Sequence, residues 1–131
     1  MKRGQIVAGK ILIVDDEERI RGLIRKTLEF VSSEFEIYEA KDGIEAVNMA
    51  GKIKPDVMIV DVMMPGMNGY DVCRKIKSSS DTKNAYVIFL TARGGSISKS
   101  TMELCGGNEI VTKPFDTEEL GNKVKKALGM A

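Results

Sequence analysis

Short apolar runs alternate with longer amphipathic stretches along this chain, and the alternation constrains its fold more than any other feature. The runs are nearly continuous in apolar residues, many of them β-branched, as strands buried on both faces require. Five segments are predicted to be strands: 10–14, 35–39, 57–60, 85–90 and 109–112.

The stretches between these strands show helical spacing. In the first of them, apolar residues recur every three or four positions, at Ile20, Leu23, Ile24, Leu28 and Val31. Further helices are expected from residue 44 onward, at 70–77, at 96–105 and after Asp116, which is the predicted N-cap of the last helix. Five strand-then-helix units predict an α/β fold, a doubly wound five-stranded parallel sheet with five helices. We expect one domain over residues 10–129, preceded by a lead-in over residues 1–9.

Charge and composition exclude several classes of function. The 20 basic and 19 acidic residues nearly balance, so nothing predicts direct binding to nucleic acid. No apolar stretch is long enough to span a membrane, and residues 1–9 lack the apolar region of a signal peptide, so we expect a cytoplasmic protein without a membrane partner. The absence of histidine excludes histidine-based zinc sites and Ser-His-Asp triads. Cys73 and Cys105 are expected to be buried thiols rather than a disulfide.

Polar residues follow four of the predicted strands. Asp15 and Asp16 follow the first, Asp61 the third, Thr91 the fourth and Lys113 the fifth. Parallel strands end at one edge of a sheet, where ligands of such folds bind, so these side chains are expected to meet. Three neighbouring carboxylates repel one another unless a cation joins them, and Mg²⁺ prefers such oxygen ligands. With the metal and Lys113 neutralising charge, Asp61 is a plausible nucleophile toward a phosphoryl group, and Thr91 is placed to hydrogen-bond it.

Each of these residues also has a simpler interpretation when taken alone. Asp15 and Asp16 fit an N-cap pair for the first helix, and Thr91 fits a strand-end hydroxyl bonded to backbone. Their convergence at one edge favours the metal and phosphoryl site. The basic residues of the first helix are interpreted as a solvated face: Arg19, Arg21, Arg25 and Lys26.

Four motifs in order resemble the receiver domain of response regulators in two-component signalling. They are IVDDE at 13–17, VDVMMPGMNG at 60–69, LTAR at 90–93 and TKPF at 112–115. The resemblance covers about Lys10 to Leu128, and four motifs in register are far more specific than one. It implies the flavodoxin-like fold that receiver domains share.

The resemblance also implies a role for each residue of the site. Asp61 would be the phosphoacceptor, and Mg²⁺, with Mn²⁺ as a substitute, would be bound by Asp16 and Asp61, by Asp15 directly or through water, and by the backbone carbonyl of Met63. Lys113 would pair with the phosphoryl group.

A second set of residues would act as the switch or shape the loop. Thr91 and Ala92 would respond to phosphorylation, and the bond between Lys113 and Pro114 would be cis. The sequence departs from the family at Ile110, where receivers usually have the Tyr or Phe that rotates as the switch residue. Aromatic coupling to Thr91 is therefore not expected here.

These features predict a phosphorylation switch rather than an enzyme, although the domain would catalyse its own Mg²⁺-dependent phosphorylation and dephosphorylation. The implied partners are a histidine kinase or histidine phosphotransfer protein, and a downstream protein on the face of the fourth helix, fifth strand and fifth helix. Alternatives are a receiver from a longer regulator or hybrid kinase, and a docking-only pseudo-receiver. A Mg²⁺-dependent phosphohydrolase is disfavoured because Met63 stands where such enzymes have a second Asp.

Overall fold

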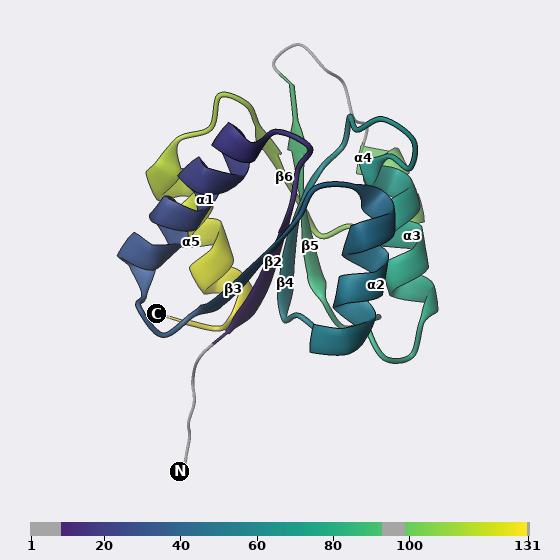
Figure 1. Cartoon of the computed structure of the whole chain (residues 1–131), viewed down its shortest axis with the longest axis horizontal. Coiled ribbons are helices and arrows are strands. Elements are labelled where there is room, and N and C mark those ends of the chain that lie inside the picture. Colours follow the sequence, from purple (N-terminus) through teal and green to yellow (C-terminus); the bar gives the residue numbers. More distant parts are fainter. Residues whose placement is uncertain (1–8, 93–98, 131) are drawn as a thin grey trace.

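Five parallel strands form one sheet between two layers of helices in the computed structural model, which describes residues 9–92 and 99–130 (Figure 1). The strands are β2 (Lys10–Val14), β3 (Glu36–Ala40), β4 (Val57–Asp61), β5 (Tyr86–Thr91) and β6 (Glu109–Thr112), in the spatial order β3-β2-β4-β5-β6. One layer holds α1 (Glu18–Val31) and α5 (Thr117–Ala127); the other holds α2 (Gly43–Ile53), α3 (Gly69–Ser78) and α4 (Lys99–Cys105). The predicted doubly wound α/β fold is confirmed.

The two faces of the sheet bury separate apolar clusters, which explains why the strands are apolar at almost every position. Side chains of a strand alternate between faces. In β2, Leu12 and Val14 belong to the cluster that includes residues of α2 and α3, whereas Ile11 and Ile13 pack with residues of α1 and α5. Both layers of helices are therefore held by the same short strands.

Strand register brings the predicted site residues to one edge. Val14 pairs with Val60, so Asp15 and Asp61 come next in line on neighbouring strands. Asp61 pairs with Leu90, and Thr91 pairs with Thr112, which places Lys113 one residue farther along. The strand order reverses between β2 and β4, and such a switch point is where doubly wound sheets bind ligands.

Some predicted element boundaries are corrected by the structure. β3 begins at Glu36, one residue later than expected, and Phe35 is buried just before it. α2 begins at Gly43, one residue earlier than the expected start at residue 44, because Asp42 is its N-cap and accepts a hydrogen bond from the Glu45 amide at 2.8 Å. Residues 96–98 of the fourth predicted helix lie outside the described residues.

Two further predictions about single residues are confirmed. Asp116 is the N-cap of α5 and accepts from the Glu118 amide at 2.8 Å. Cys73 and Cys105 are both free and buried, and the Cys73 thiol donates to the Cys105 carbonyl at 3.1 Å.

Candidate functional site

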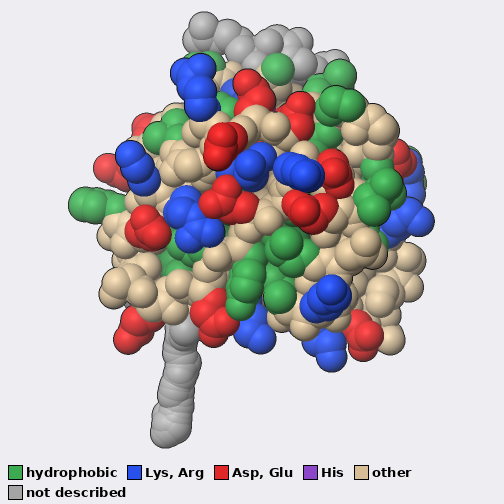
Figure 2. Space-filling model, viewed as in Figure 1, with side chains coloured by type: hydrophobic (Ala, Val, Ile, Leu, Met, Phe, Trp, Pro, Cys, Tyr) green, Lys and Arg blue, Asp and Glu red, His purple; other side chains and the backbone are tan. Residues whose placement is uncertain are grey.

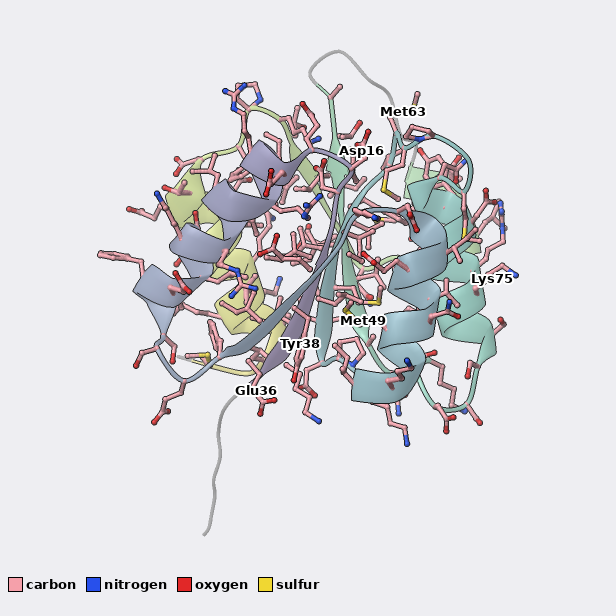
Figure 3. All side chains as sticks on the ribbon, viewed as in Figure 1. Asp16, Glu36, Tyr38, Met49, Met63 and Lys75 are labelled. Carbon is pink, nitrogen blue, oxygen red and sulfur yellow. The ribbon has the colours of Figure 1, made fainter. Side chains whose placement is uncertain are left out.

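Three carboxylates converge at the edge of the sheet where the strands end. Asp15 is fully buried, Asp61 is 5% exposed and Asp16 is exposed. One oxygen from each lies within 4.8 Å of the others. Figure 3 shows Asp16 and Met63 at this end of the sheet, and Glu36 and Tyr38 toward the other. The donor set, all oxygen and all anionic, fits a hard divalent cation such as Mg²⁺.

Lys113 bridges the two buried carboxylates. Its Nζ lies 3.1 Å from Asp15 Oδ2 and 3.3 Å from Asp61 Oδ2. The residue is held where β6 ends, because its amide donates to the Thr91 carbonyl at 2.7 Å. The peptide bond from Lys113 to Pro114 is cis. A single ammonium therefore contacts two carboxylates that approach it from different strands.

The electrostatics of the site follow from this shared ammonium. Burial and the charge of Asp15 raise the pKa of Asp61 above its ordinary value. Lys113 and the Met63 amide, which lies 3.1 Å from Asp61 Oδ1, lower this pKa but do not outweigh the other two effects. Burial alone would lower the pKa of Lys113, but Asp15 and Asp61 outweigh it and raise that pKa. With Asp16 included, three carboxylates face one ammonium, so a cation would relieve the remaining repulsion.

The remaining predicted site residues lie around this centre. Thr91 ends β5 and is 6% exposed, whereas Ala92 is exposed. Ile110 lies in β6 opposite Phe89 and is partly exposed. Met63 is 72% exposed at the mouth of the site, next to Asp61. The structure gives these positions, and the predicted roles of these residues, including the Met63 carbonyl as a ligand, stay predictions.

Close packing of backbone behind Asp61 explains a glycine in the second motif. A Cβ on Gly69 would lie 2.5 Å from the Asp61 carbonyl oxygen, closer than real side chains come. The Gly69 amide donates to the Val62 carbonyl at 3.0 Å, and the Asn68 side chain caps α3 by accepting from the Asp71 amide at 3.0 Å. The first turn of α3 is therefore packed directly against the peptide that follows the phosphoacceptor candidate.

The interpretation of Asp15 and Asp16 as helix caps is wrong. The N-cap of α1 is Glu17, whose side chain makes no capping hydrogen bond. Asp15 instead accepts from the Glu17 amide through Oδ1 at 2.9 Å, while its Oδ2 faces Lys113. Its carboxylate therefore links the start of α1 to the site.

The predicted solvated face of α1 is wrong for Arg21 and Arg25. Their side chains are 15% and 35% exposed, respectively. Arg21 Nε lies 3.0 Å from Oε1 of Glu39 on β3, and Arg25 Nε lies 2.6 Å from Oε2 of the same carboxylate. Glu39 was not identified from the sequence. The sequence did contain a signal for these contacts. The two arginines are four residues apart and so lie on one face of the helix, next to the apolar stripe of Ile20 and Ile24, and a predicted strand carries an acidic residue that could pair with them.

This fold and site define the class of protein: a doubly wound α/β domain with an acidic, lysine-bearing centre at its topological switch point. The family model for the response regulator receiver domain matches residues 11–125. The chain belongs to this family, and it is a receiver domain of two-component signalling.

Named relatives agree with this assignment. The transcriptional regulatory protein YrkP of Bacillus subtilis (strain 168) is 38% identical over 118 residues, which are 90% of this chain and 48% of YrkP. Response regulator MprA of Mycobacterium leprae (strain TN) is 37% identical over 120 residues, 91% of this chain and 50% of MprA. The chain spans about half the length of the curated relatives it matches.

Solved structures show the same architecture. Vibrio cholerae chemotaxis protein CheY4 has a TM-score of 0.83 at 30% identity, over 92% of this chain and 99% of that one. The receiver domain of sensor histidine kinase PA1611 from Pseudomonas aeruginosa PAO1 has a TM-score of 0.82 at 25% identity, over 94% of this chain and 99% of that one. That structure was solved with a magnesium ion in its active site cleft.

In residues 9–92 and 99–130 of the present chain, no helix has the length and apolar character needed to cross a membrane.

Proposed function

We propose that the chain is a phosphorylation switch in which Asp61 accepts a phosphoryl group in a Mg²⁺-dependent reaction. The observation that carries this proposal is the contact of Lys113 with both Asp15 and Asp61, beside a third carboxylate on Asp16. Mg²⁺, for which Mn²⁺ can substitute, would be held by the carboxylates of Asp15, Asp16 and Asp61 and by the Met63 carbonyl. When bound, the cation supplies positive charge that stabilises the phosphoryl oxygens during transfer.

The side chains of the site divide the remaining work. A carboxylate oxygen of Asp61 forms the new bond to phosphorus, while the phosphorus–nitrogen bond of a phosphohistidine donor breaks and the imidazole leaves with the electron pair. The Met63 amide orients Asp61 through Oδ1. Lys113 places its charge beside the phosphoryl oxygens, as preorganised electrostatic stabilisation requires. The Thr91 hydroxyl donates to one of these oxygens once the group is on Asp61.

The donor is a histidine kinase or a histidine phosphotransfer protein, and the output is altered binding of a downstream protein to the face formed by α4, β6 and α5. The domain acts in the cytoplasm, contacts no nucleic acid itself and turns over no external substrate beyond its own phosphorylation and dephosphorylation. An alternative form of this proposal is a receiver that belongs to a longer regulator or hybrid kinase. The magnesium ion in the PA1611 receiver domain supports the choice of metal.

Intact mass spectrometry after incubation with acetyl phosphate and Mg²⁺ tests this proposal. The wild type should gain one phosphoryl group, and Asp61→Asn should gain none. Asp81→Asn, which changes an exposed carboxylate in the connection before β5, is the matched control and should behave as wild type. A wild-type rate of phosphorylation in Asp61→Asn would contradict the proposal. An unmodified wild type would favour a docking-only pseudo-receiver, and turnover of unrelated phosphomonoesters would favour a phosphohydrolase.

A further inference from the structure

We infer that Arg21 is a positioning residue for the metal site: it fixes the peptide that joins Asp15 to Asp16 and thereby aims the Asp16 carboxylate at the cation. The inference rests on the proposed function, because it concerns the same Mg²⁺ site. It assigns a role to a residue on α1 whose side chain belongs to none of the four receiver motifs.

Arg21 uses two nitrogens to connect two separate parts of the fold. Its Nη1 donates to the carbonyl oxygen of Asp15 at 2.7 Å, and its Nε donates to Glu39 Oε1 at 3.0 Å. The side chain is only 15% exposed, so these bonds are partly protected from water. A planar guanidinium is suited to this bridge, because its donors are held in a fixed fork.

The bond to the Asp15 carbonyl matters because the strand ladder has ended there. Val14 is the last residue of β2 paired with β3, opposite Ala40. Asp15 itself is fixed by its amide, which donates to the Ala40 carbonyl at 3.2 Å, and by its carboxylate, which binds the Glu17 amide and Lys113. Its carbonyl forms one half of the next peptide, and the other half is the nitrogen of Asp16. Arg21 therefore sets the plane from which the exposed Asp16 side chain projects.

Glu39 holds Arg21 in place from the neighbouring strand. Its second carboxylate oxygen accepts from Arg25 Nε at 2.6 Å, so Glu39 is fixed on both sides. On the face of the molecule shown in Figure 2, acidic and basic side chains lie next to one another and form no large patch of one charge. Glu39 and Arg21 therefore link β3 to the peptide between Asp15 and Asp16. Groups that orient metal-ligating carboxylates in this way commonly change metal affinity about 10- to 100-fold when they are removed.

Arg25 offers a closely matched control. Like Arg21, it makes one bond to Glu39 and one bond to a backbone carbonyl, that of Ile37 at 3.1 Å; in addition it lies 3.9 Å from Glu29 on α1. Ile37 lies in β3, away from the strand ends where the acidic site is built. Changing either arginine to Gln thus removes a bond to Glu39 and a bond to a backbone carbonyl, and Arg25→Gln also removes the ion pair with Glu29 on the exposed side of α1. Only Arg21→Gln releases the Asp15 carbonyl.

Titration with Mn²⁺, followed by the electron paramagnetic resonance signal of the free ion, measures the effect directly. We expect Arg21→Gln to bind Mn²⁺ about tenfold more weakly than wild type. Arg25→Gln should bind nearly as wild type, although urea unfolding should show a similar loss of stability in both variants. In phosphorylation by acetyl phosphate, Arg21→Gln should need more Mg²⁺ for half the maximal rate while its rate at saturating Mg²⁺ stays near wild type.

Distinct outcomes separate failure of this inference from failure of the proposed function. Wild-type Mn²⁺ affinity in Arg21→Gln, or an equal loss in both arginine variants, overturns the positioning role while the metal site stands. Wild-type affinity in Asp16→Asn overturns the proposed metal site and the inference with it. If Arg21→Gln does not fold, Arg21→Lys carries the test, since one ammonium cannot reproduce the fork; wild-type affinity in Arg21→Lys then overturns the inference.

Discussion

The ammonium of Lys113 lies 3.1 Å from Asp15 Oδ2, joining the end of β6 to the end of β2 across 98 residues of sequence. Asp15 is fully buried, and Lys113 also lies 3.3 Å from Asp61. One positive charge is thus divided between two buried carboxylates, with a third on Asp16 nearby. The folded protein therefore retains excess negative charge at this edge, and a bound cation would stabilise it.

The first prediction is that Mg²⁺ stabilises the protein against urea. A cation that binds only the folded state should raise the free energy of unfolding by about 1.4 kcal/mol at a concentration ten times its Kd. Asp16→Asn should show a smaller gain, because it removes an exposed carboxylate from the ligand set. Urea unfolding followed by far-ultraviolet circular dichroism provides the measurement, and an equal gain in both proteins would indicate a nonspecific salt effect.

The sequence was sufficient to predict that Asp15, Asp61 and Lys113 meet and that Thr91 ends its strand at the same edge, because each follows a short apolar run interpreted as a buried strand. The ends of parallel strands share an edge, so the spatial order of the strands in the sheet did not need to be known. Single-residue boundaries were less secure: the alternation in β3 is compatible with a start at Phe35 or Glu36, and burial of Phe35 beside the strand gives no periodic signal that separates them.

The contacts of Arg21 and Arg25 could not be predicted in the same way. Helical periodicity places both arginines beside the apolar stripe of α1, but it does not say which strand lies next to them. That depends on the crossover that places β3 beside β2, and with it Glu39 beside α1. A charged residue at the border of a buried face is therefore compatible with solvation or with an ion pair until the strand order is known.

A second prediction concerns the pH dependence of the Glu39 contacts. Burial alone would raise the pKa of Glu39, but hydrogen bonds and charges from Arg25 and Arg21 outweigh it and hold that pKa below its ordinary value. A carboxyl whose pKa is lowered by folding stabilises the folded state above the unfolded pKa, about 4.3 for Glu, and this contribution is lost as the pH falls through the folded pKa.

Glu39→Gln should therefore be less stable than wild type at pH 7, by about 1 kcal/mol after allowance for partial exposure. The difference should shrink as the pH falls below about 4. Urea unfolding across this range measures it, with Glu34→Gln, an exposed carboxylate before β3, as the control. If the difference in stability between wild type and Glu39→Gln stays constant to the lowest pH, the charge of Glu39 contributes nothing to the stability of the fold.

A third prediction concerns the reactivity of Cys73. Burial raises the pKa of its thiol to about 11, and the thiol donates to the Cys105 carbonyl. Since the thiolate is the reactive form, Cys73 should react very slowly with iodoacetamide at pH 8 in the folded protein and readily in urea. Intact mass with and without urea provides the measurement, and Cys73→Ala identifies which cysteine is modified. Rapid labelling of Cys73 in the native protein would contradict its buried, hydrogen-bonded position.

The last prediction concerns where phosphorylation changes the domain. Phosphorylation is expected to draw Thr91 toward Asp61, and Ala92, the residue after β5, must follow. Ile110 faces Phe89 in the register of β5 and β6 and has no aromatic ring to rotate inward, so the change should not extend far into β6. We therefore expect beryllofluoride with Mg²⁺, used as a phosphoryl mimic, to alter hydrogen exchange most strongly between Thr91 and Cys105.

Asp61→Asn treated in the same way is the control and should show no such change, because it lacks the carboxylate to which the mimic binds. A partner that prefers the altered segment would then select the phosphorylated population, and its difference in affinity for the two states would set how far the equilibrium moves. If the strongest change falls on α1 instead, the assignment of the downstream partner to the face of α4, β6 and α5 is wrong.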